Sequence, residues 1–393
     1  MADTKAEDVS SDLFELSPGE RASRMLHAWI REGRFPAGRR LPSERKLADR
    51  MNVSRTSVRS AMEELQEEGL ITIRPDGSRW VSEDVSVSLL DDTVAILSDC
   101  PEGPRERRDQ ESTGWAHYIH LGAIQALREG GLHSLNLESQ RVLSRGPGYL
   151  ISESLRGIIA LRNFVRFGGA QPTLQALREA GIPVVVYGDV KMLPEFDTVT
   201  SDHAKGCYEL TKWLVRRGCR RILRFWGQAG GEQNGSPDWL RRRDLGYERA
   251  MEEAGLEPLP SLKLRQGSGA AKSDFEHSTR TYAGYLMEHV QEPDPVDAIM
   301  VVSDGLYFPT AAACRLLGKI PQEDILIAGY DNYWQDVVAR RPEKTTPVAT
   351  VDKRNIQIGR TLVELLEQRA AGELPPGPQH KSVEPELVVV END

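Results

Sequence analysis

Apolar residues near the start of the chain recur at helical spacing in three short segments. The first segment runs from Pro18 to Gly33, where the glycine can end the helix. A second helix is predicted from the N-cap residue Ser43 to about Met51, and a third begins after the N-cap residue Ser54. A tight turn separates the second helix from the third. This spacing is typical of a helix-turn-helix.

Two short segments of alternating polar and apolar residues follow the third helix. They run from Leu70 to Arg74 and from Arg79 to Ser82, on either side of the turn Pro75-Asp76-Gly77-Ser78. Three helices followed by such a hairpin predict a winged helix-turn-helix. In such a domain the N-terminal end of the third helix enters the major groove of DNA.

Basic side chains lie where such a domain meets DNA. Arg55 and Thr56 are in the first turn of the third helix, and Arg59 is one turn later on the same face. Arg45 is in the first turn of the preceding helix, within reach of a phosphate. Arginine binds guanine through two hydrogen bonds or clamps a phosphate. The alternative, solvated surface arginines, is less favoured because caps, turn, wing and arginines occur together.

The charge distribution separates this segment from the rest of the chain. Residues 20–82 hold 13 Lys or Arg and 9 Asp or Glu, a net charge of +4. The whole chain of 393 residues has a net charge of -9, so the remainder carries -13. A small basic module on an acidic body indicates that the module, and not the body, meets a polyanion.

The segment resembles the DNA-binding domain of the GntR family over about Ser17 to Ser82. The resemblance rests on LPSERKLA, NVSRTSVRSAMEELQEEGLI and the glycine that follows, in that order. It implies DNA contacts at five positions of this chain: Arg45, Arg55, Thr56, Arg59 and the wing glycine Gly77. One departure concerns the wing, because the family often has G-x-G where this chain has PDGS.

The remaining residues alternate short apolar strands with helical stretches. Predicted strands are Thr93–Leu97, Gly157–Leu161, Pro183–Tyr187, Arg221–Phe225, Ala298–Val302 and Ile325–Gly329. Predicted helices are Trp115–Arg128, Thr173–Ala180, His203–Arg217, Arg241–Ala254, Ser278–Val290 and Thr310–Leu317. Such alternation predicts an α/β fold with parallel sheets. The length favours two lobes, whose strand ends face each other across a ligand cleft. We expect a disordered leader over 1–16, the winged helix-turn-helix over 17–82, a linker over 83–92 and the effector domain over 93–393.

This body resembles the effector domain of the LacI/GalR regulators, which is periplasmic-binding-protein-like. The phrases that carry the resemblance are GIPVVVYGD, VTSDHAKGCYELTKWLVRRGCRRILRF, RRRDLGYERAMEEAG, DAIMVVSDGLYFPTAAACRLLGK and DILIAGYDN. It covers about Asp92 to Val390. It implies two lobes joined by three crossovers, a small ligand in the cleft and a homodimer.

The resemblance also implies effector-binding residues. Arg243, in R-x-x-G-Y, matches a position that binds a ligand hydroxyl or carboxylate, and Asp304, in VVSD, matches one that accepts hydrogen bonds from hydroxyls. Charged groups of this kind form strong, oriented hydrogen bonds with a sugar. Asp189 is a weaker candidate, because it falls about one position late. A structural salt bridge is the alternative for Arg243 and Asp304.

Two further residues lie near the predicted cleft. Trp115 follows a long charged loop and is a candidate for stacking on a sugar face, with packing at a lobe surface as the alternative. Asp331, in GYDN, is left out of the candidate set because its carboxylate is expected to bond to the backbone.

Signals for catalysis are weak. GSGAAKS, at 267–273, has alanine where a phosphate loop needs glycine before the lysine. Neither H-E-x-x-H nor G-x-S-x-G is present, and the eight histidines and four cysteines lack metal-ligand spacing, so no metal or cofactor is predicted. The alternative for the body is an enzyme-like fold that binds pyridoxal phosphate, which the LacI-like phrases disfavour.

The sequence therefore predicts a regulator rather than an enzyme. We expect a cytoplasmic homodimer that binds double-stranded operator DNA, with thiols kept reduced and no membrane span. We further expect a repressor of carbohydrate-metabolism genes, controlled by a sugar-like effector bound between two lobes.

Overall fold

The computed structural model divides into two compact units, Met1–Asp91 and Asp92–Asp393. The residues that the structure describes are 17–31, 34–82, 90, 92–98, 114–153, 155–165, 169–188, 193–227, 237–264, 275–291, 293–337 and 342–390. The predicted linker over 83–92 and the phosphate-loop-like stretch over 267–273 lie mostly or wholly outside these residues.

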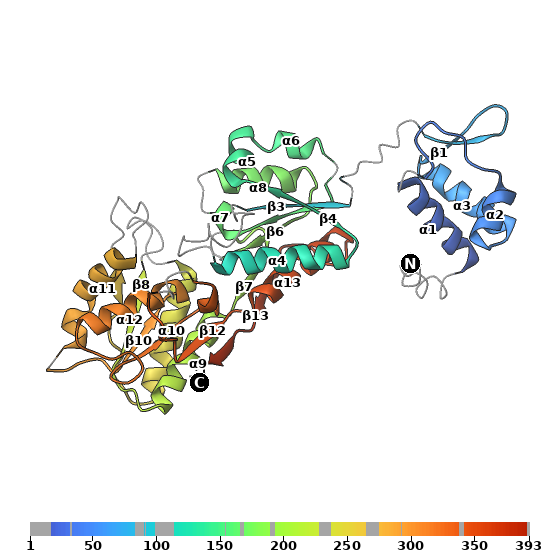
Figure 1. The fold of residues 1–393 in the computed structure, drawn as a ribbon. Helices are drawn as coiled ribbons and strands as arrows, with labels where there is room; N and C mark the ends of the chain where they lie inside the picture. The colour runs from blue at the N-terminus through green and yellow to red at the C-terminus, as the bar shows by residue number, and fades with distance from the viewer. Residues whose placement is uncertain are drawn as a thin grey trace. The chain divides into compact units, whose positions relative to one another are not determined.

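The first unit is a winged helix-turn-helix (Figure 1). Its elements are α1 (Pro18–Arg31), α2 (Glu44–Met51), α3 (Arg55–Glu67), β1 (Ile71–Ile73) and β2 (Arg79–Val81). The two strands pair antiparallel, with Thr72 opposite Trp80. Apolar faces of all three helices meet in one core, in which Leu26, Leu47 and Leu65 are fully buried. The predicted fold of this unit is confirmed.

The two predicted helix caps differ in the structure. Ser54 has extended backbone, and its side chain accepts a hydrogen bond from the Ser57 backbone N–H at 3.0 Å. This bond satisfies one of the donors that the first turn of α3 leaves without a helical partner. Ser43 occupies the N-cap position of α2 with extended backbone, but its side chain makes no capping hydrogen bond. Ser43 therefore marks the start of α2 without the predicted capping contact.

The second unit has two α/β lobes. The sheet of the first lobe has six parallel strands in the order β13-β7-β6-β5-β3-β4. Their bounds are β3 (Thr93–Leu97), β4 (His133–Leu137), β5 (Gly157–Ala160), β6 (Val184–Tyr187), β7 (Asp197–Ser201) and β13 (His380–Val383). The helices α4 (Gly114–Glu129) and α13 (Asn355–Ala370) cover one face, and α5 (Ser139–Arg145), α6 (Gly148–Ile151), α7 (Arg162–Val165) and α8 (Ala170–Glu179) lie on the other (Figure 1).

The sheet of the second lobe has four parallel strands in the order β11-β10-β8-β9. Their bounds are β8 (Ile222–Gly227), β9 (Leu262–Leu264), β10 (Ala298–Val301) and β11 (Leu326–Ala328). Alternate strand residues face two helix layers. Ile222 packs with α9 (His203–Arg216) and α10 (Asp238–Glu253), and Leu223 packs with α11 (Phe275–Val290) and α12 (Tyr307–Leu316).

The chain passes between the lobes three times, as the resemblance implied. It leaves β7 for α9 at 201–203, returns from β12 (Ala349–Asp352) to α13, and leaves β13 for β14 (Glu386–Val389). The strands β12 and β14 form an antiparallel pair beside α9. All six predicted strands and all six predicted helices are present, with ends that differ by a few residues. The fold is α/β, as predicted.

Candidate effector site and DNA-binding surface

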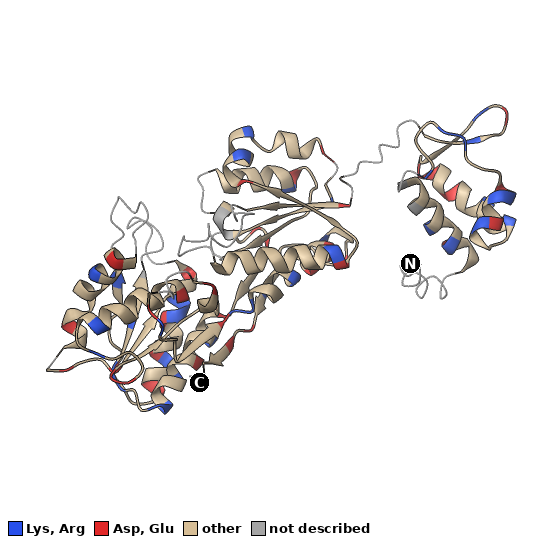
Figure 2. Ribbon diagram, in the orientation of Figure 1, with Lys and Arg blue, Asp and Glu red and all other residues tan. Residues whose placement is uncertain are grey.

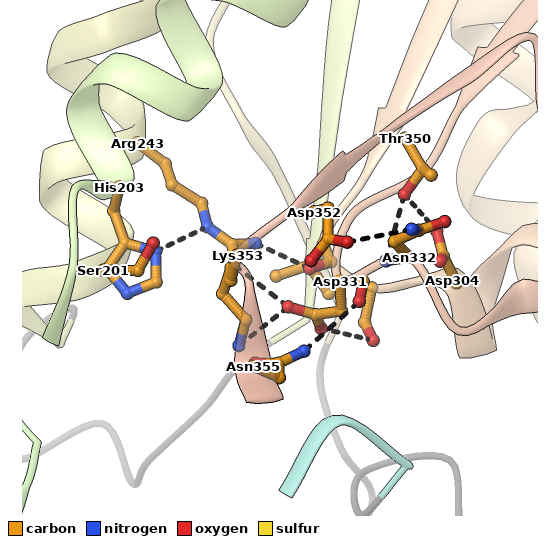
Figure 3. A network of polar contacts seen from close by, with 12 residues as sticks. Ser201, His203, Arg243, Asp304, Asp331, Asn332, Thr350, Asp352, Lys353 and Asn355 are labelled. Carbon is orange, nitrogen blue, oxygen red and sulfur yellow. Dashed lines mark hydrogen bonds and ion pairs between the residues drawn. The ribbon is translucent and has the colours of Figure 1, made fainter. Parts of the chain in front are cut away.

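A buried polar network lies where the chain crosses between the lobes (Figure 3). The Asp331 carboxylate is at its centre, 2.8 Å from Lys353 Nζ and 3.8 Å from Arg243 Nη2. The Ser303 hydroxyl donates a hydrogen bond to Asp331 Oδ2 at 3.0 Å. Asp331, Lys353 and Arg243 are each at most 3% exposed. Charges this deeply buried require partners, because desolvation disfavours an isolated ion by several kcal/mol.

Arg243 is fixed by contacts on several sides. Its guanidinium lies 3.3 Å from the centre of the Tyr330 ring and 4.8 Å from that of Trp239. Nη1 donates to the Val302 carbonyl at 2.6 Å, and Nε points to His203 Nδ1 at 3.5 Å. Because α10 presents Arg243 toward β10 and the loop after β11, the side chain reaches Asp331 from the second lobe.

Lys353 follows β12, on the passage back to the first lobe. Its Nζ lies 2.8 Å from Asp331 Oδ1 and 4.2 Å from the centre of the Trp115 ring, at the start of α4. An ammonium group has three N–H donors. Among the described residues the contacts of Nζ are thus one carboxylate oxygen and one aromatic face. The ammonium retains capacity for further hydrogen bonds.

Asp304 has a different environment from Asp331. Its Oδ2 accepts hydrogen bonds from the backbone N–H groups of Tyr333 at 2.8 Å and Trp334 at 3.2 Å. Its Oδ1 accepts one from the Thr350 hydroxyl at 2.9 Å. Burial, and secondarily the nearby Asp331 carboxylate, raise the pKa of Asp304 to about 7. The Asp304 side chain anchors the loop after β11 to the start of α12.

Backbone strain is concentrated in the same region. Asp331, Asn332 and Arg354 have φ values of 92°, 53° and 56°, which non-glycine residues seldom adopt. Asp352 links the two turns, since Oδ2 accepts from Asn332 Nδ2 at 3.1 Å and Oδ1 accepts from the Arg354 N–H at 2.6 Å. Strain of this kind persists only where surrounding contacts hold it, and it often marks a functional site.

The predicted effector residues meet this network to different degrees. Arg243 lies inside it. Trp115 reaches it through Lys353, although Trp115 is 9% exposed and packs in the core of the first lobe. Asp304 is adjacent, with both oxygens engaged by protein donors. Asp189 lies outside the described residues, so its role stays a prediction, as do the effector contacts of the other three.

Sequence reasoning placed two residues differently. Asp331 was expected to bond to the backbone, but its carboxylate meets side chains, and Asp304 accepts the backbone hydrogen bonds instead. The phrase GYDN points to Asp331, but the local sequence does not show that its carboxylate contacts side chains instead of the backbone. Lys353 is not among the effector residues that the sequence predicts. Its one local signal is that it directly follows the buried strand β12.

The second candidate surface is on the winged helix-turn-helix. Arg45, Arg55, Thr56, Arg59 and Gly77 are all exposed there. Figure 2 shows basic residues on the helices and the hairpin of this unit. Gly77 has φ of 73° and donates its backbone N–H to the Arg74 carbonyl at 2.8 Å, which forms the wing turn. Their DNA contacts remain predictions.

Glu44 connects the recognition helix to the wing. Arg59 donates to both Glu44 oxygens, through Nε at 3.2 Å and Nη2 at 2.9 Å. Arg79, at the start of β2, donates to Glu44 Oε1 at 2.6 Å. These hydrogen bonds, from Arg59 first and Arg79 second, lower the pKa of Glu44 to about 2. The Glu44 carboxylate therefore fixes the orientation of the exposed Arg59 guanidinium.

The wing is held by a chain of contacts. Asp76 Oδ1 accepts from the Ser78 N–H at 3.0 Å, and Trp80 Nε1 donates to the Ser78 hydroxyl at 2.7 Å. The Arg74 guanidinium lies 3.6 Å from the centre of the Trp80 ring. The PDGS turn is thus ordered without the second glycine of the family pattern.

Family models match both parts of the chain. Residues 18–81 match the model described as bacterial regulatory proteins, gntR family, and residues 211–390 match a periplasmic binding protein-like domain. The chain joins a GntR-type DNA-binding domain to a periplasmic-binding-protein-like domain. Both resemblances seen in the sequence are confirmed.

Known regulators show the same combination or part of it. The HTH-type transcriptional regulator CelR of Thermobifida fusca is 28% identical over 267 residues, covering 65% of this chain and 69% of the relative. The arabinose metabolism transcriptional repressor of Geobacillus stearothermophilus is 24% identical over 359 residues, covering 88% of this chain and 90% of the relative. The solved complex of CelR with cellobiose has a TM-score of 0.57 at 21% identity and covers 89% of this chain and 99% of that chain.

These comparisons bear on the enzyme alternative. The relatives are transcriptional regulators, and none of the matches favours a body that binds pyridoxal phosphate. Within the described residues, no cluster of three or more His, Cys, Asp or Glu side chains is arranged to hold a metal ion. No helix in that part of the chain has the length and apolar character needed to cross a bilayer.

Proposed function

We propose that this protein is a DNA-binding transcriptional repressor of carbohydrate-metabolism genes, controlled by a sugar-like effector. The observation that carries the proposal is the buried Arg243–Asp331–Lys353 network at the crossovers. The same chain contains a GntR-type DNA-binding domain. The similarity to an arabinose metabolism repressor and to a regulator in complex with cellobiose supports a sugar as the effector.

The network suits a binding role because its members come from different parts of the body. Arg243 belongs to the second lobe, Asp331 to the loop after β11, and Lys353 to the passage back to the first lobe. An effector that bonds to these groups stabilises one arrangement of the lobes relative to others. A small molecule bound at this network therefore alters how the effector domain positions the attached DNA-binding domains.

The DNA-binding side of the proposal follows the symmetry of such regulators. Two chains in the cytoplasm pair through their bodies and place two winged helices on the half-sites of a near-palindromic operator. Arg55 and Thr56 face base edges, and Arg45 faces a phosphate. If the effector favours an arrangement that suits the half-site spacing less well, it weakens operator binding. By reciprocity the operator weakens effector binding by the same factor.

The experiment begins with selection of an operator from random duplex DNA by the full-length protein. Binding of that operator is then measured by fluorescence anisotropy with and without sugars. We expect at least one sugar to weaken operator binding in wild type and to have no effect in Arg243→Ala, which keeps its operator affinity. Loss of operator binding in Arg243→Ala with its thermal unfolding unchanged would argue against a separate effector site. Failure to select any duplex would refute the DNA-binding role.

A further inference from the structure

The charges in the crossover network do not balance. Two basic side chains, Arg243 and Lys353, are each 2% exposed. Asp331 lies between them and, among the described residues, is the only carboxylate within ion-pair distance of either. Asp304 offsets little of the excess, because burial raises its pKa to about 7 and its oxygens are held by Thr350 and two backbone N–H groups.

The remaining acidic group in Figure 3 does not restore the balance. Asp352 is partly exposed, and its two oxygens accept from Asn332 Nδ2 and the Arg354 N–H. His203 contributes no negative charge, and its Nδ1 faces the Arg243 Nε. A buried excess cation is unfavourable, because it loses water without gaining a counter-charge. The network is electrostatically incomplete.

Buried hydrogen-bonding atoms at the same place are also without partners. Among the described residues, no hydrogen bond reaches Ser201 Oγ or Asn355 Oδ1. Ser201 is fully buried and Asn355 is 5% exposed. Ser201 ends β7 and Asn355 begins α13, so both lie on the crossovers, and Figure 3 shows them beside the charged residues. Buried polar atoms are usually satisfied, so these two indicate groups that a ligand would supply.

We propose that the effector is an acidic sugar, whose anionic group pairs with Lys353 and whose hydroxyls bond to Asp331, Asn355 and Ser201. This inference rests on the proposed function, in which a small molecule binds at this network. A carboxylate or a phosphate on the sugar would supply the missing charge. The hydroxyl groups, which both donate and accept, suit two acceptor oxygens and one serine hydroxyl.

Lys353 is the specific partner of the anion for geometric reasons. Arg243 already donates from Nη1 to a carbonyl, points Nε to His203, and has one face on the Tyr330 ring. Lys353 has one carboxylate oxygen and one ring as its contacts among the described residues. A charge-assisted hydrogen bond to Lys353 contributes about 1.5–3 kcal/mol, which corresponds to at least about tenfold in Kd.

The test compares matched neutral and acidic sugars on the full-length protein by isothermal titration calorimetry. The pairs are arabinose with arabinonate, cellobiose with cellobionate, and glucose with glucuronate, and the phosphate arm uses glucose 6-phosphate and arabinose 5-phosphate. We expect one acidic member to bind at least about tenfold more tightly than its neutral partner. Which arm binds identifies the anionic group as carboxylate or phosphate.

Variants locate the preference at one side chain. Lys353→Met should reduce the acid-to-neutral ratio to about one, and Lys353→Arg, which keeps the charge, should retain the preference. Lys263, which is exposed on β9, gives the matched control. Lys263→Met should leave the ratio unchanged. Persistence of the full preference in a folded Lys353→Met protein would overturn the inference.

The remaining outcomes separate this inference from the proposed function. Equal or tighter binding of neutral sugars, with release of the operator, would overturn the acidic-sugar inference and leave the repressor function standing. Absence of binding in every arm, together with operator binding that no sugar changes, would count against both.

Discussion

The two units of this protein each contain one carboxylate between two basic side chains, in opposite surroundings. In the DNA-binding unit Glu44 accepts from Arg59 and Arg79, and the Arg59, Arg79 and Glu44 side chains are 55%, 19% and 16% exposed. In the effector unit Asp331 lies between Arg243 and Lys353, and all three side chains are at most 4% exposed. The same arrangement of charges is therefore partly in contact with water in one unit and enclosed in the protein interior in the other.

Solvent determines what each cluster can do. Near water, an ion pair contributes little to stability, because the charges are well hydrated and screened by salt. The Glu44 cluster is therefore suited mainly to fixing the directions of two guanidinium groups, and we propose that these face DNA. In the interior, a missing partner leaves a charge without hydration, so the Asp331 cluster is sensitive to any group that enters or leaves it. The first cluster is suited to orientation and the second to sensing.

Removing the central carboxylate of the buried cluster has the largest expected effect. Asp331→Ala leaves Arg243 and Lys353 buried without a carboxylate in ion-pair distance, and we expect a loss of about 3–5 kcal/mol in the free energy of unfolding of the effector unit. Differential scanning calorimetry of the full chain would measure it. Glu44→Ala, the matched change in the other unit, should shift its own transition far less. Equal shifts in the two variants would contradict the contrast drawn between the clusters.

Arg55→Ala tests the exposed side of the comparison through DNA instead of stability. Arg55 is exposed in the first turn of α3, so its loss should leave the melting temperature unchanged. If Arg55 reads a base edge, operator binding should weaken by about 1–3 kcal/mol, with relaxed specificity at one position of each half-site. Anisotropy titrations against the selected operator and its single-base variants would measure both. Unchanged discrimination among those variants would remove Arg55 from the base contacts.

The pKa values of one carboxylate in each unit shift in opposite directions. Burial raises the pKa of Asp304 from 3.8 to about 7, whereas hydrogen bonds from arginine lower that of Glu44 from 4.5 to about 2. Between pH 4 and pH 7 folded Asp304 holds a proton that the unfolded chain has lost, so its contribution to the free energy of unfolding falls as pH rises through that range. The Glu44 contribution is present above pH 4.5 and is lost as pH falls toward 2.

The Asp304 shift predicts a measurable difference between wild type and Asp304→Asn. The wild-type effector unit should lose stability relative to the variant as pH rises from about 4 to about 7, and the difference should then level off. Calorimetric scans at intervals of pH would follow it, with the DNA-binding transition as an internal reference. A difference that stays constant over this range would show that Asp304 titrates at its ordinary pKa.

How far the sequence predicts the structure differs between strands. Thr93–Leu97 and Pro183–Tyr187 are predictable as strands because they are mainly short continuous apolar runs, which are typical of buried parallel strands. Asp197–Ser201 was missed because DTVTS is polar. Its buried Asp197 carboxylate is paired from outside the strand, since it accepts from Arg369 Nε at 2.7 Å and Nη2 at 2.8 Å. Partners this distant in the chain cannot be read from local composition.

The candidate site divides in the same way. Arg243 was predicted because it lies in a recognisable local phrase. The Lys353–Asp331 contact was not predicted, because it joins two chain passages whose positions depend on the three crossovers. The positive φ values at Asp331 and Arg354 had no sequence signal either, since neither residue is glycine. Local chemistry was predictable, and its assembly across the lobes was not.

The smallest expected effect concerns Glu44→Gln, which keeps the size of the side chain and removes its charge. Arg59 and Arg79 lose the acceptor that orients them, so specific operator binding should weaken several-fold. At the same time a negative charge beside DNA disappears, so binding to random duplex should tighten modestly and depend more steeply on salt. The ratio of specific to non-specific affinity therefore falls. Anisotropy titrations with operator and scrambled duplex over a range of salt concentrations would measure this ratio, with Glu63→Gln, an exposed change on α3, as the control. An unchanged ratio would mean that Glu44 does not orient the DNA contacts. The Glu44 cluster would then have no role in DNA recognition.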